Sequence, residues 1–181
     1  MFLSVSVDGF FEGPNREIDW HIVDDELHRH VNEVLRDAGA FLSGRITHEL
    51  MVSVWPTADQ DPASTPPMVE FAGIWKEKPK FVYSKTLDHA DWNTTIVRDV
   101  VPAEVQALKE RFDGDLILGG PDLARRFREL DLIDEYRLYV HPVLIGTGKP
   151  YLWPSDHRTK LRLVQTRTFG TGVVLLHYAR G

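Results

Sequence analysis

Hydrophobic and polar residues alternate at the start of the chain, which is the spacing of a β-strand. Over residues 2–7, Leu3, Val5 and Val7 fall on one face and two serines fall on the other. An Asp-Gly pair then interrupts the pattern. The chain is therefore expected to open with a strand that buries one face.

Four later segments show the three- and four-residue spacing of helices whose apolar side chains share one face. The longest runs from Asp24 to a stop signal at Gly39, with apolar residues recurring from Leu27 to Ala38. Proline suits the first position of a helix, and two of the remaining segments open with it. These three helices are expected after Arg45 (Ile46, Leu50 and Val54), from Pro102 (Val105, Leu108 and Phe112) and from Pro121 (Leu123, Phe127 and Leu130).

Short apolar runs between these helices predict strands. They cover residues 40–43, 81–83, 94–97, 116–118 and 136–140. The fully apolar run 116–118 indicates a buried central strand. Two alternating runs, 161–168 and 173–178, flank Gly170 and Gly172 and predict an antiparallel hairpin near the end of the chain.

Residues 56–70 contain four prolines with polar residues between them. This composition predicts a long surface loop, and loops of that length often cover a binding site. The alternation of strands and helices around it predicts an α/β fold with a mostly parallel sheet. A single domain is expected to cover residues 1–181.

Composition narrows the class of protein. The 181 residues are 43% hydrophobic and 27% charged, which is enough apolar surface for a sizeable core. The formal net charge is −6 and no run of basic residues exceeds two, which argues against nucleic acid as a partner. The chain has no cysteine, so disulfides, thiol nucleophiles and Cys-ligated zinc are excluded.

Neither a metal site nor a membrane is expected. The eight histidines show no metal-ligand spacing. No apolar stretch approaches the roughly 18 residues of a membrane span, and the first basic residue is Arg16, so a signal peptide is not expected either. These features favour a soluble, cytoplasmic protein that acts on a small molecule.

Two glycine-containing turns carry the strongest indication of a ligand. Gly44-Arg45-Ile46-Thr47 and Leu118-Gly119-Gly120-Pro121-Asp122 each follow an apolar run and open a predicted helix. A helix N-terminus presents unpaired backbone N–H groups to an anion. Together with the positive charge of Arg45 and Lys85, the two turns predict a phosphorylated dinucleotide.

Each of these features also has an ordinary structural explanation. The first turn can be a simple strand-to-helix connection with a solvated arginine, and Gly119-Gly120 can reflect tight helix–strand packing. Ser84-Lys85 can contact a ribose 2′-phosphate, which would favour NADP over NAD, or can be a solvated turn. The G-x-G-x-x-G pattern of the usual dinucleotide-binding fold is absent.

Six segments in order resemble the dihydrofolate reductase-like superfamily, and most closely the reductase domain of bacterial riboflavin biosynthesis and its stand-alone relatives. The resemblance covers nearly the whole chain. Its segments are Ser4–Phe10, Asp19-Trp20, Gly44-Arg45-x-Thr47, Tyr83-Ser84-Lys85, Leu118-Gly119-Gly120 and His141–Pro150.

The resemblance implies a three-layer fold, with helices on both faces of a mixed, mostly parallel sheet and a C-terminal antiparallel hairpin. It implies an NADPH-dependent oxidoreductase, with the cofactor across the carboxyl ends of the parallel strands and a loop from Asp8 to Trp20 closing over the nicotinamide. It also implies a cis peptide between Gly119 and Gly120, and a homodimer. The residues expected at NADP(H) are Gly44, Arg45, Thr47, Ser84, Lys85, Gly119, Gly120, Asp122, Leu123 and Ala124.

For catalysis, hydride transfer to a C=N or C=O group needs a proton source in a dry pocket. The family places a carboxylate near the start of the first helix, shortly after a tryptophan, so Asp25 and Trp20 are the expected substrate-facing residues. Acidic residues at this position also suit a helix N-terminus, Asp24 being a natural N-cap.

Two functions remain as alternatives to reduction of a pterin- or pyrimidine-like heterocycle. One is a nucleotide-binding protein without catalysis, such as a sensor. The other is a transferase that acts on nucleotides, although no P-loop lysine or acidic metal cluster supports it.

Overall fold

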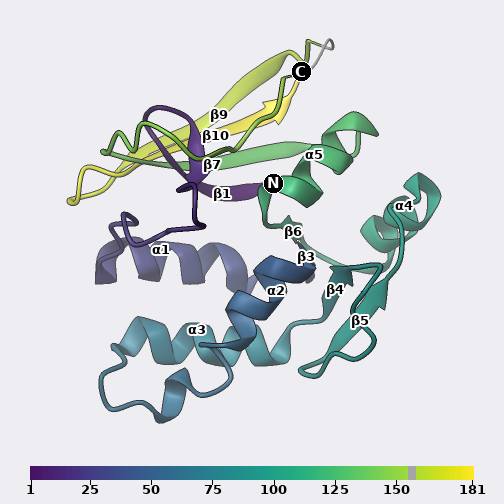
Figure 1. The fold of residues 1–181 in the computed structure, drawn as a ribbon, viewed down its shortest axis with the longest axis horizontal. Helices are drawn as coiled ribbons and strands as arrows, with labels where there is room; N and C mark the ends of the chain where they lie inside the picture. The colour runs from purple at the N-terminus through teal and green to yellow at the C-terminus, as the bar shows by residue number, and fades with distance from the viewer. Residues whose placement is uncertain (155–157) are drawn as a thin grey trace. The chain divides into compact units, whose positions relative to one another are not determined.

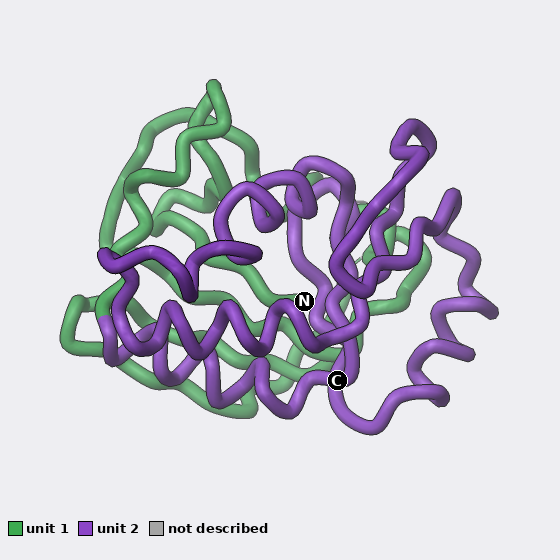
Figure 2. The backbone as a smooth tube through the Cα atoms, turned by 90° about the horizontal axis from the view of Figure 1, so that it is seen from below, with its two compact units in different colours: residues 1–24, 124–181 green, residues 25–123 purple. Residues whose placement is uncertain are grey.

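The computed structural model describes residues 1–154 and 158–181, and the chain divides into two compact units. Unit 1 contains residues 1–24 and 124–181, and unit 2 contains the continuous segment 25–123 (Figure 2). One boundary precedes helix α1 (Asp25–Arg36), and the other falls within helix α5 (Pro121–Glu129). Unit 2 is thus an insertion between the two pieces of unit 1.

Unit 2 is built on a parallel sheet with the strand order β5-β4-β3-β6 (Figure 1). Its strands are β3 (Ala40–Gly44), β4 (Lys80–Tyr83), β5 (Thr94–Val97) and β6 (Leu116–Leu118). Ala40, Leu42 and Val82 are buried in its core, as expected for strands that are covered on both faces. All four strands agree with the predicted runs to within one residue.

The helices of unit 2 begin where the chain carries start signals. They are α1, α2 (Arg45–Val52), the 3₁₀ turn η1 (Ala58–Gln60), α3 (Pro66–Glu77) and α4 (Pro102–Arg111). Helices α1 and α3 pack side by side, and α2 contacts β3 and β4 (Figure 1). The predicted helices after Asp24, after Arg45 and at Pro102 are confirmed.

The prediction of a loop over residues 56–70 is wrong over its last five residues, 66–70. Helix α3 begins at Pro66, and the two consecutive prolines occupy its first positions. Proline has no N–H to lose there and its φ angle is already helical, so the residues that read as loop residues start a helix. Phe71 and Trp75 then anchor α3 in the core.

The apolar residues that were predicted to share the buried face of helix α2 are exposed. Ile46, Leu50 and Val54 are 37%, 47% and 43% exposed, whereas His48 is buried. The four-residue spacing located the helix correctly, but the side of the helix that is buried is the one that carries His48.

Unit 1 contains the other four-stranded sheet, with the order β1-β7-β10-β9. Its strands are β1 (Phe2–Ser6), β7 (Glu135–His141), β9 (Leu161–Thr168) and β10 (Val174–Arg180), and β2 (Phe10–Glu12) pairs separately with β8 (Lys149–Pro150). β1 runs parallel to β7, whereas β10 is antiparallel to both β7 and β9. The predicted C-terminal hairpin is therefore confirmed as β9–β10.

The α/β class with mixed strand directions is confirmed. The hydrogen bonds between the described strands form two four-stranded sheets and a two-stranded ladder, rather than the one sheet that the sequence predicted. Among the described residues, none of the helices has both the length and the apolar character of a membrane span.

Candidate functional site

The predicted ligand-binding turns of unit 2 meet at one edge of its sheet. β4, β3 and β6 are neighbouring parallel strands, so their carboxyl ends lie at the same edge. Ser84 and Lys85 follow β4, Gly44 ends β3, and Gly119 follows β6. Ligands of parallel α/β sheets bind outside the carboxyl ends of the strands, so this edge is the candidate site.

The two glycine-containing turns are in contact. A Cβ atom built on Gly120 would lie 2.5 Å from Oγ1 of Thr47, and Gly120 has a φ of +85°. Thr47 belongs to the first turn of α2, and Gly120 directly precedes α5. Glycine is needed at position 120 both for its backbone conformation and for this close approach.

The cis peptide that the resemblance implied between Gly119 and Gly120 is not present. This bond is trans, as are all peptide bonds among the described residues. A cis bond before a residue other than proline costs about 2.5–4 kcal/mol. The turn is made instead by the positive φ of Gly120.

Gly44 and Gly119 border open space. A Cβ atom on either residue would meet no heavy atom within 4 Å. Gly44 is the N-cap of α2 and makes no side-chain capping hydrogen bond, and the first turn of α2 has no acidic residue. The backbone N–H groups of this turn are therefore suited to an anion, and the residues present fit a pyrophosphate.

The two predicted cations lie at the surface in ion pairs. Arg45 Nη1 donates to both carboxylate oxygens of Glu49, at 2.9 and 3.0 Å. Lys85 Nζ lies 3.0 Å from Asp99 Oδ1, and both of these side chains are exposed. Exposed pairs of this kind contribute about 0–1 kcal/mol, so a phosphate group can compete with either carboxylate.

Ser84 has a structural role that the sequence did not reveal. Its buried hydroxyl oxygen accepts hydrogen bonds from the backbone N–H groups of Thr86 and Leu87, at 3.2 and 3.0 Å. This oxygen closes the turn that carries Lys85. Ser84 is therefore suited to positioning the lysine, in addition to any direct contact with a ligand.

Sequence reasoning missed Arg98. This residue follows β5, and its Nη1 donates to the carbonyl oxygens of Ser84 and Leu87, at 3.0 and 2.8 Å. It thus adds a second cation to the turn of Lys85. The signal that could have identified it is its place directly after a predicted strand, as for Lys85.

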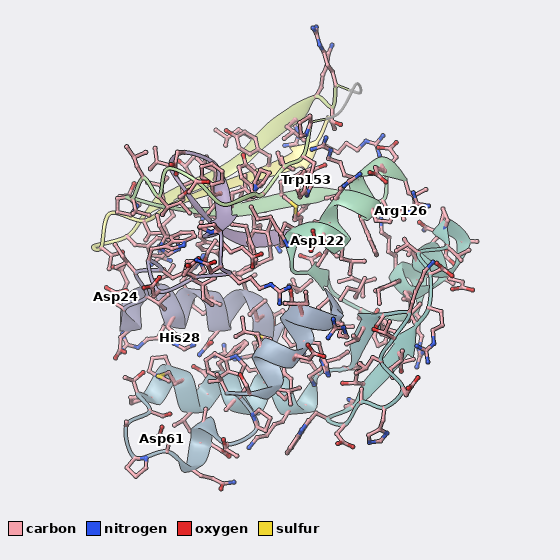
Figure 3. The ribbon with its side chains drawn as sticks, viewed as in Figure 1. Asp24, His28, Asp61, Asp122, Arg126 and Trp153 are labelled. Carbon is pink, nitrogen blue, oxygen red and sulfur yellow. The ribbon has the colours of Figure 1, made fainter. Side chains whose placement is uncertain are left out.

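The first residues of α5 differ in how far their side chains are exposed. Asp122 is exposed in the first turn (Figure 3), whereas Leu123 and Ala124 are only 8% and 2% exposed. The buried side chains of Leu123 and Ala124 pack in the interior, so only their backbone could contact a cofactor.

The two predicted substrate-facing residues fall in different units. Asp25 opens α1 in unit 2, where its carboxylate is 45% exposed and lies 3.0 Å from Arg29 Nη2. Trp20 belongs to unit 1, and its Nε1–H donates to the carbonyl oxygen of Glu17 at 3.1 Å. The carboxylate of Asp25 is thus partly open to solvent, and its role toward a substrate stays a prediction.

An aromatic cluster lies near Asp25 in unit 2. The ring of His28, on the side of α1 that faces α3 (Figure 3), is 6.0 Å from both Trp55 and Phe71, and those two rings meet edge to face at 4.4 Å. Burial lowers the pKa of His28, and the carboxylates of Asp25 and Glu70 partly oppose this shift. The cluster is therefore largely apolar, and burial favours the uncharged form of its imidazole.

No metal centre is found in the part of the chain that the structure describes. No three His, Cys, Asp or Glu side chains there are grouped so that they could hold an ion. Of the eight histidines, His157 lies outside the described residues.

Comparisons with known proteins identify a family from one sequence model and a common fold from solved structures. The family model of the RibD C-terminal domain matches residues 1–175. The chain is 36% identical over 180 residues to the uncharacterized protein YyaP of Bacillus subtilis, covering 97% of this chain and 91% of that protein. It is 27% identical over 183 residues to the uncharacterized protein YwjB of the same organism, covering 99% and 96%.

Solved structures with a similar fold include a putative riboflavin biosynthesis protein from Shewanella sp. PV-4, with a TM-score of 0.76, 19% identity and coverage of 99% and 97%. Dihydrofolate reductase from Enterococcus faecalis, complexed with NADP(H), has a TM-score of 0.66 and 12% identity, and the match covers 99% of this chain and 94% of that one. The deaminase/5-amino-6-(5-phosphoribosylamino)uracil reductase of Thermotoga maritima has a TM-score of 0.65 and 17% identity, and this chain spans 55% of its length. At these identities the likeness concerns the fold.

Proposed function

Because this chain belongs to the RibD C-terminal domain family, we propose that it is an NADPH-dependent reductase of a small heterocycle related to pterins or pyrimidines. The observation that carries the proposal is the shared edge of β4, β3 and β6, where Lys85, Arg45 and the Gly119-Gly120 turn come together. Two cations and two glycine-containing turns at one edge suit the several phosphate groups of a phosphorylated dinucleotide.

Each group at this edge has a distinct role in the proposal. The open space at Gly44 and Gly119 admits the pyrophosphate, and the N–H groups at the start of α2 donate to its oxygens. The guanidinium of Arg45 and the ammonium of Lys85 recognise phosphate oxygens, the latter at the adenosine 2′ position. When bound, NADPH would supply the hydride.

The experiment that tests this proposal is a titration with NADPH and with NADH, followed by quenching of the fluorescence of the five tryptophans. We expect NADPH to bind at least tenfold more tightly, which corresponds to about 1.4 kcal/mol. Lys85→Gln should reduce this preference, because only NADPH carries the 2′-phosphate. Equal affinities, or no binding, would contradict the proposal.

Lys76→Gln is the matched control for this measurement. Lys76 also pairs with a carboxylate, at 2.7 Å from Asp59 Oδ1, but it lies on α3, away from the carboxyl ends of the strands. Its substitution should leave the preference for NADPH unchanged. Tight NADPH binding without turnover of any heterocycle would favour the alternative of a non-catalytic nucleotide-binding protein.

A further inference from the structure

Unit 1 contains a closed cluster of two imidazoles and an indole that the proposed cofactor site does not use. The rings of His21 and His141 stack, with centroids 5.1 Å apart and planes 19° from parallel. The indole of Trp20 meets both of them nearly edge-on, at 4.3 and 5.7 Å. His141 has no exposed surface at all.

The hydrogen bonding of His141 fixes the position of its proton. Its Nδ1 accepts a hydrogen bond from the backbone N–H of Ile22 at 3.0 Å. In a neutral imidazole one nitrogen accepts and the other donates, so the proton of His141 must lie on Nε2. Burial lowers the pKa of His141 to about 4, which keeps the ring neutral at pH 7.

The Nε2 atoms of both histidines are buried and have no hydrogen-bond partner among the residues that the structure describes. Leaving a buried donor without a partner costs about 1–3 kcal/mol, and the large majority of buried polar groups are paired. The hydrogen bond from Ile22 provides a partner for Nδ1 of His141 but leaves Nε2 without one. The neighbouring indole cannot relieve this lack, since an indole N–H is only a donor and that of Trp20 already bonds to Glu17.

The segment that packs against His141 has no regular secondary structure. Trp20, His21 and Ile22 all lie in the segment 13–24, which contains neither helix nor strand. The segment is held to β7 by the hydrogen bond from Ile22 to His141. Displacement of this segment would uncover His141 without altering any strand.

We propose that His141 Nε2–H is the hydrogen-bond donor to a carbonyl oxygen of a planar heterocyclic ligand that unit 1 holds beside Trp20. The class of ligand rests on the proposed function, whereas the unpartnered donor does not. A planar ring with a carbonyl oxygen on its edge can accept the hydrogen bond from Nε2 when that oxygen lies near the plane of the imidazole.

The first test uses nuclear magnetic resonance of protein labelled with ¹⁵N at histidine, with pteridine-2,4-dione as the probe. In the free protein, the resonances of His141 should show the Nε2–H tautomer. Adding the probe should shift the Nε2 signal of His141. The analogue 2,4-diaminopteridine, in which amino groups replace both carbonyls, should shift it at least fivefold less at equal concentration.

Two substitutions of His141 then separate the role of the Nε2–H donor from that of the hydrogen bond that Nδ1 accepts from Ile22. The amide oxygen of asparagine can take the place of Nδ1, and the amide nitrogen of glutamine can take the place of Nε2. We therefore expect His141→Asn to weaken binding of pteridine-2,4-dione about five- to tenfold, as loss of one hydrogen bond implies. His141→Gln should retain affinity within about threefold, although it loses the acceptor for Ile22.

Three results would overturn the inference: no change at His141 when the probe is added, equal weakening by both substitutions, or weakening by His141→Gln alone. Thermal unfolding of both variants separates loss of binding from loss of the fold. The cofactor titration is independent of these readouts. A probe that shifts His141 in a protein that does not bind NADPH would therefore refute the proposed function and leave the inference standing.

Discussion

Asp25 is a surface carboxylate whose chemical and structural contributions can be separated. Its contact with Arg29 is an exposed pair within one helix, and such pairs contribute about 0.3–0.5 kcal/mol. We expect Asp25→Asn to abolish most turnover of the substrate while changing the free energy of unfolding by less than about 0.5 kcal/mol. Steady-state oxidation of NADPH and chemical denaturation measure the two effects.

Arg29→Gln is the matched variant for Asp25, because it breaks the same ion pair and keeps the carboxylate. It should retain turnover and NADPH affinity. If Asp25→Asn retained full turnover as well, the role of Asp25 as the substrate-facing carboxylate would be refuted.

Gly120 and Gly119 are neighbours with opposite sensitivity to substitution. Gly120→Ala places a Cβ at a φ of +85° and against Thr47, so it should destabilise the protein by at least about 1–2 kcal/mol. Gly119→Ala meets no atom within 4 Å, so it should fold nearly as well but bind NADPH more weakly. Thermal unfolding and the fluorescence titration test the two halves of this prediction, and a larger loss of stability in Gly119→Ala would contradict it.

The stacked histidines predict a loss of stability in mild acid. Burial, which is the main cause, lowers the pKa of both His21 and His141 from 6.5 to about 4. The unfolded chain therefore binds more protons between these values, and the free energy of unfolding falls as pH drops from 6.5 to 4. The contribution of the fully buried His141 alone is about 2–3 kcal/mol.

Urea denaturation at several pH values measures this slope. The uncharged double variant His21→Asn/His141→Asn should lose most of it, because asparagine does not titrate. An unchanged slope in the variant would assign the acid sensitivity to the carboxylates instead.

At the scale of elements, the sequence predicted the strands of unit 2 and the edge at which they end. Short apolar runs such as 116–118 leave little choice of structure, whereas the strand order β5-β4-β3-β6 was not predicted. What it could not predict was set by tertiary packing. Pro66 and Pro67 start a helix because Phe71 and Trp75 find a core to enter.

The site was predictable in the same uneven way. Glycine and basic residues after strands located the edge, but the hydrogen bonds of Ser84 and Arg98 depend on how the turn closes. The role of Nε2 of His141 was beyond any pattern, since it requires knowing that Ile22 occupies the other nitrogen. Polar residues buried by distant segments carry no periodic signal.

At the scale of the whole molecule, we propose that the protein forms a homodimer through β9. This strand lies at the edge of its sheet, and Leu161, Leu163 and Val164 are 42%, 52% and 46% exposed. An exposed apolar edge strand is a template for pairing with another chain. Light scattering should give twice the mass of one chain, and Leu163→Glu should halve it.

Val54→Glu is the control for added charge at an exposed apolar position, because Val54 is 43% exposed but lies in unit 2. This variant should remain dimeric. A wild-type protein that is monomeric at micromolar concentration would refute the dimer.

The insertion of unit 2 into unit 1 has a consequence for biosynthesis. β1 leaves the ribosome well before its strand partner β7, and the amino group of Met1 donates to the carbonyl oxygen of Glu135 at 2.6 Å. All four strands of the unit 2 sheet, by contrast, have been translated once Leu118 is added to the chain. Nascent chains therefore carry Leu3 and Val5 without a sheet until more than a hundred further residues have been translated.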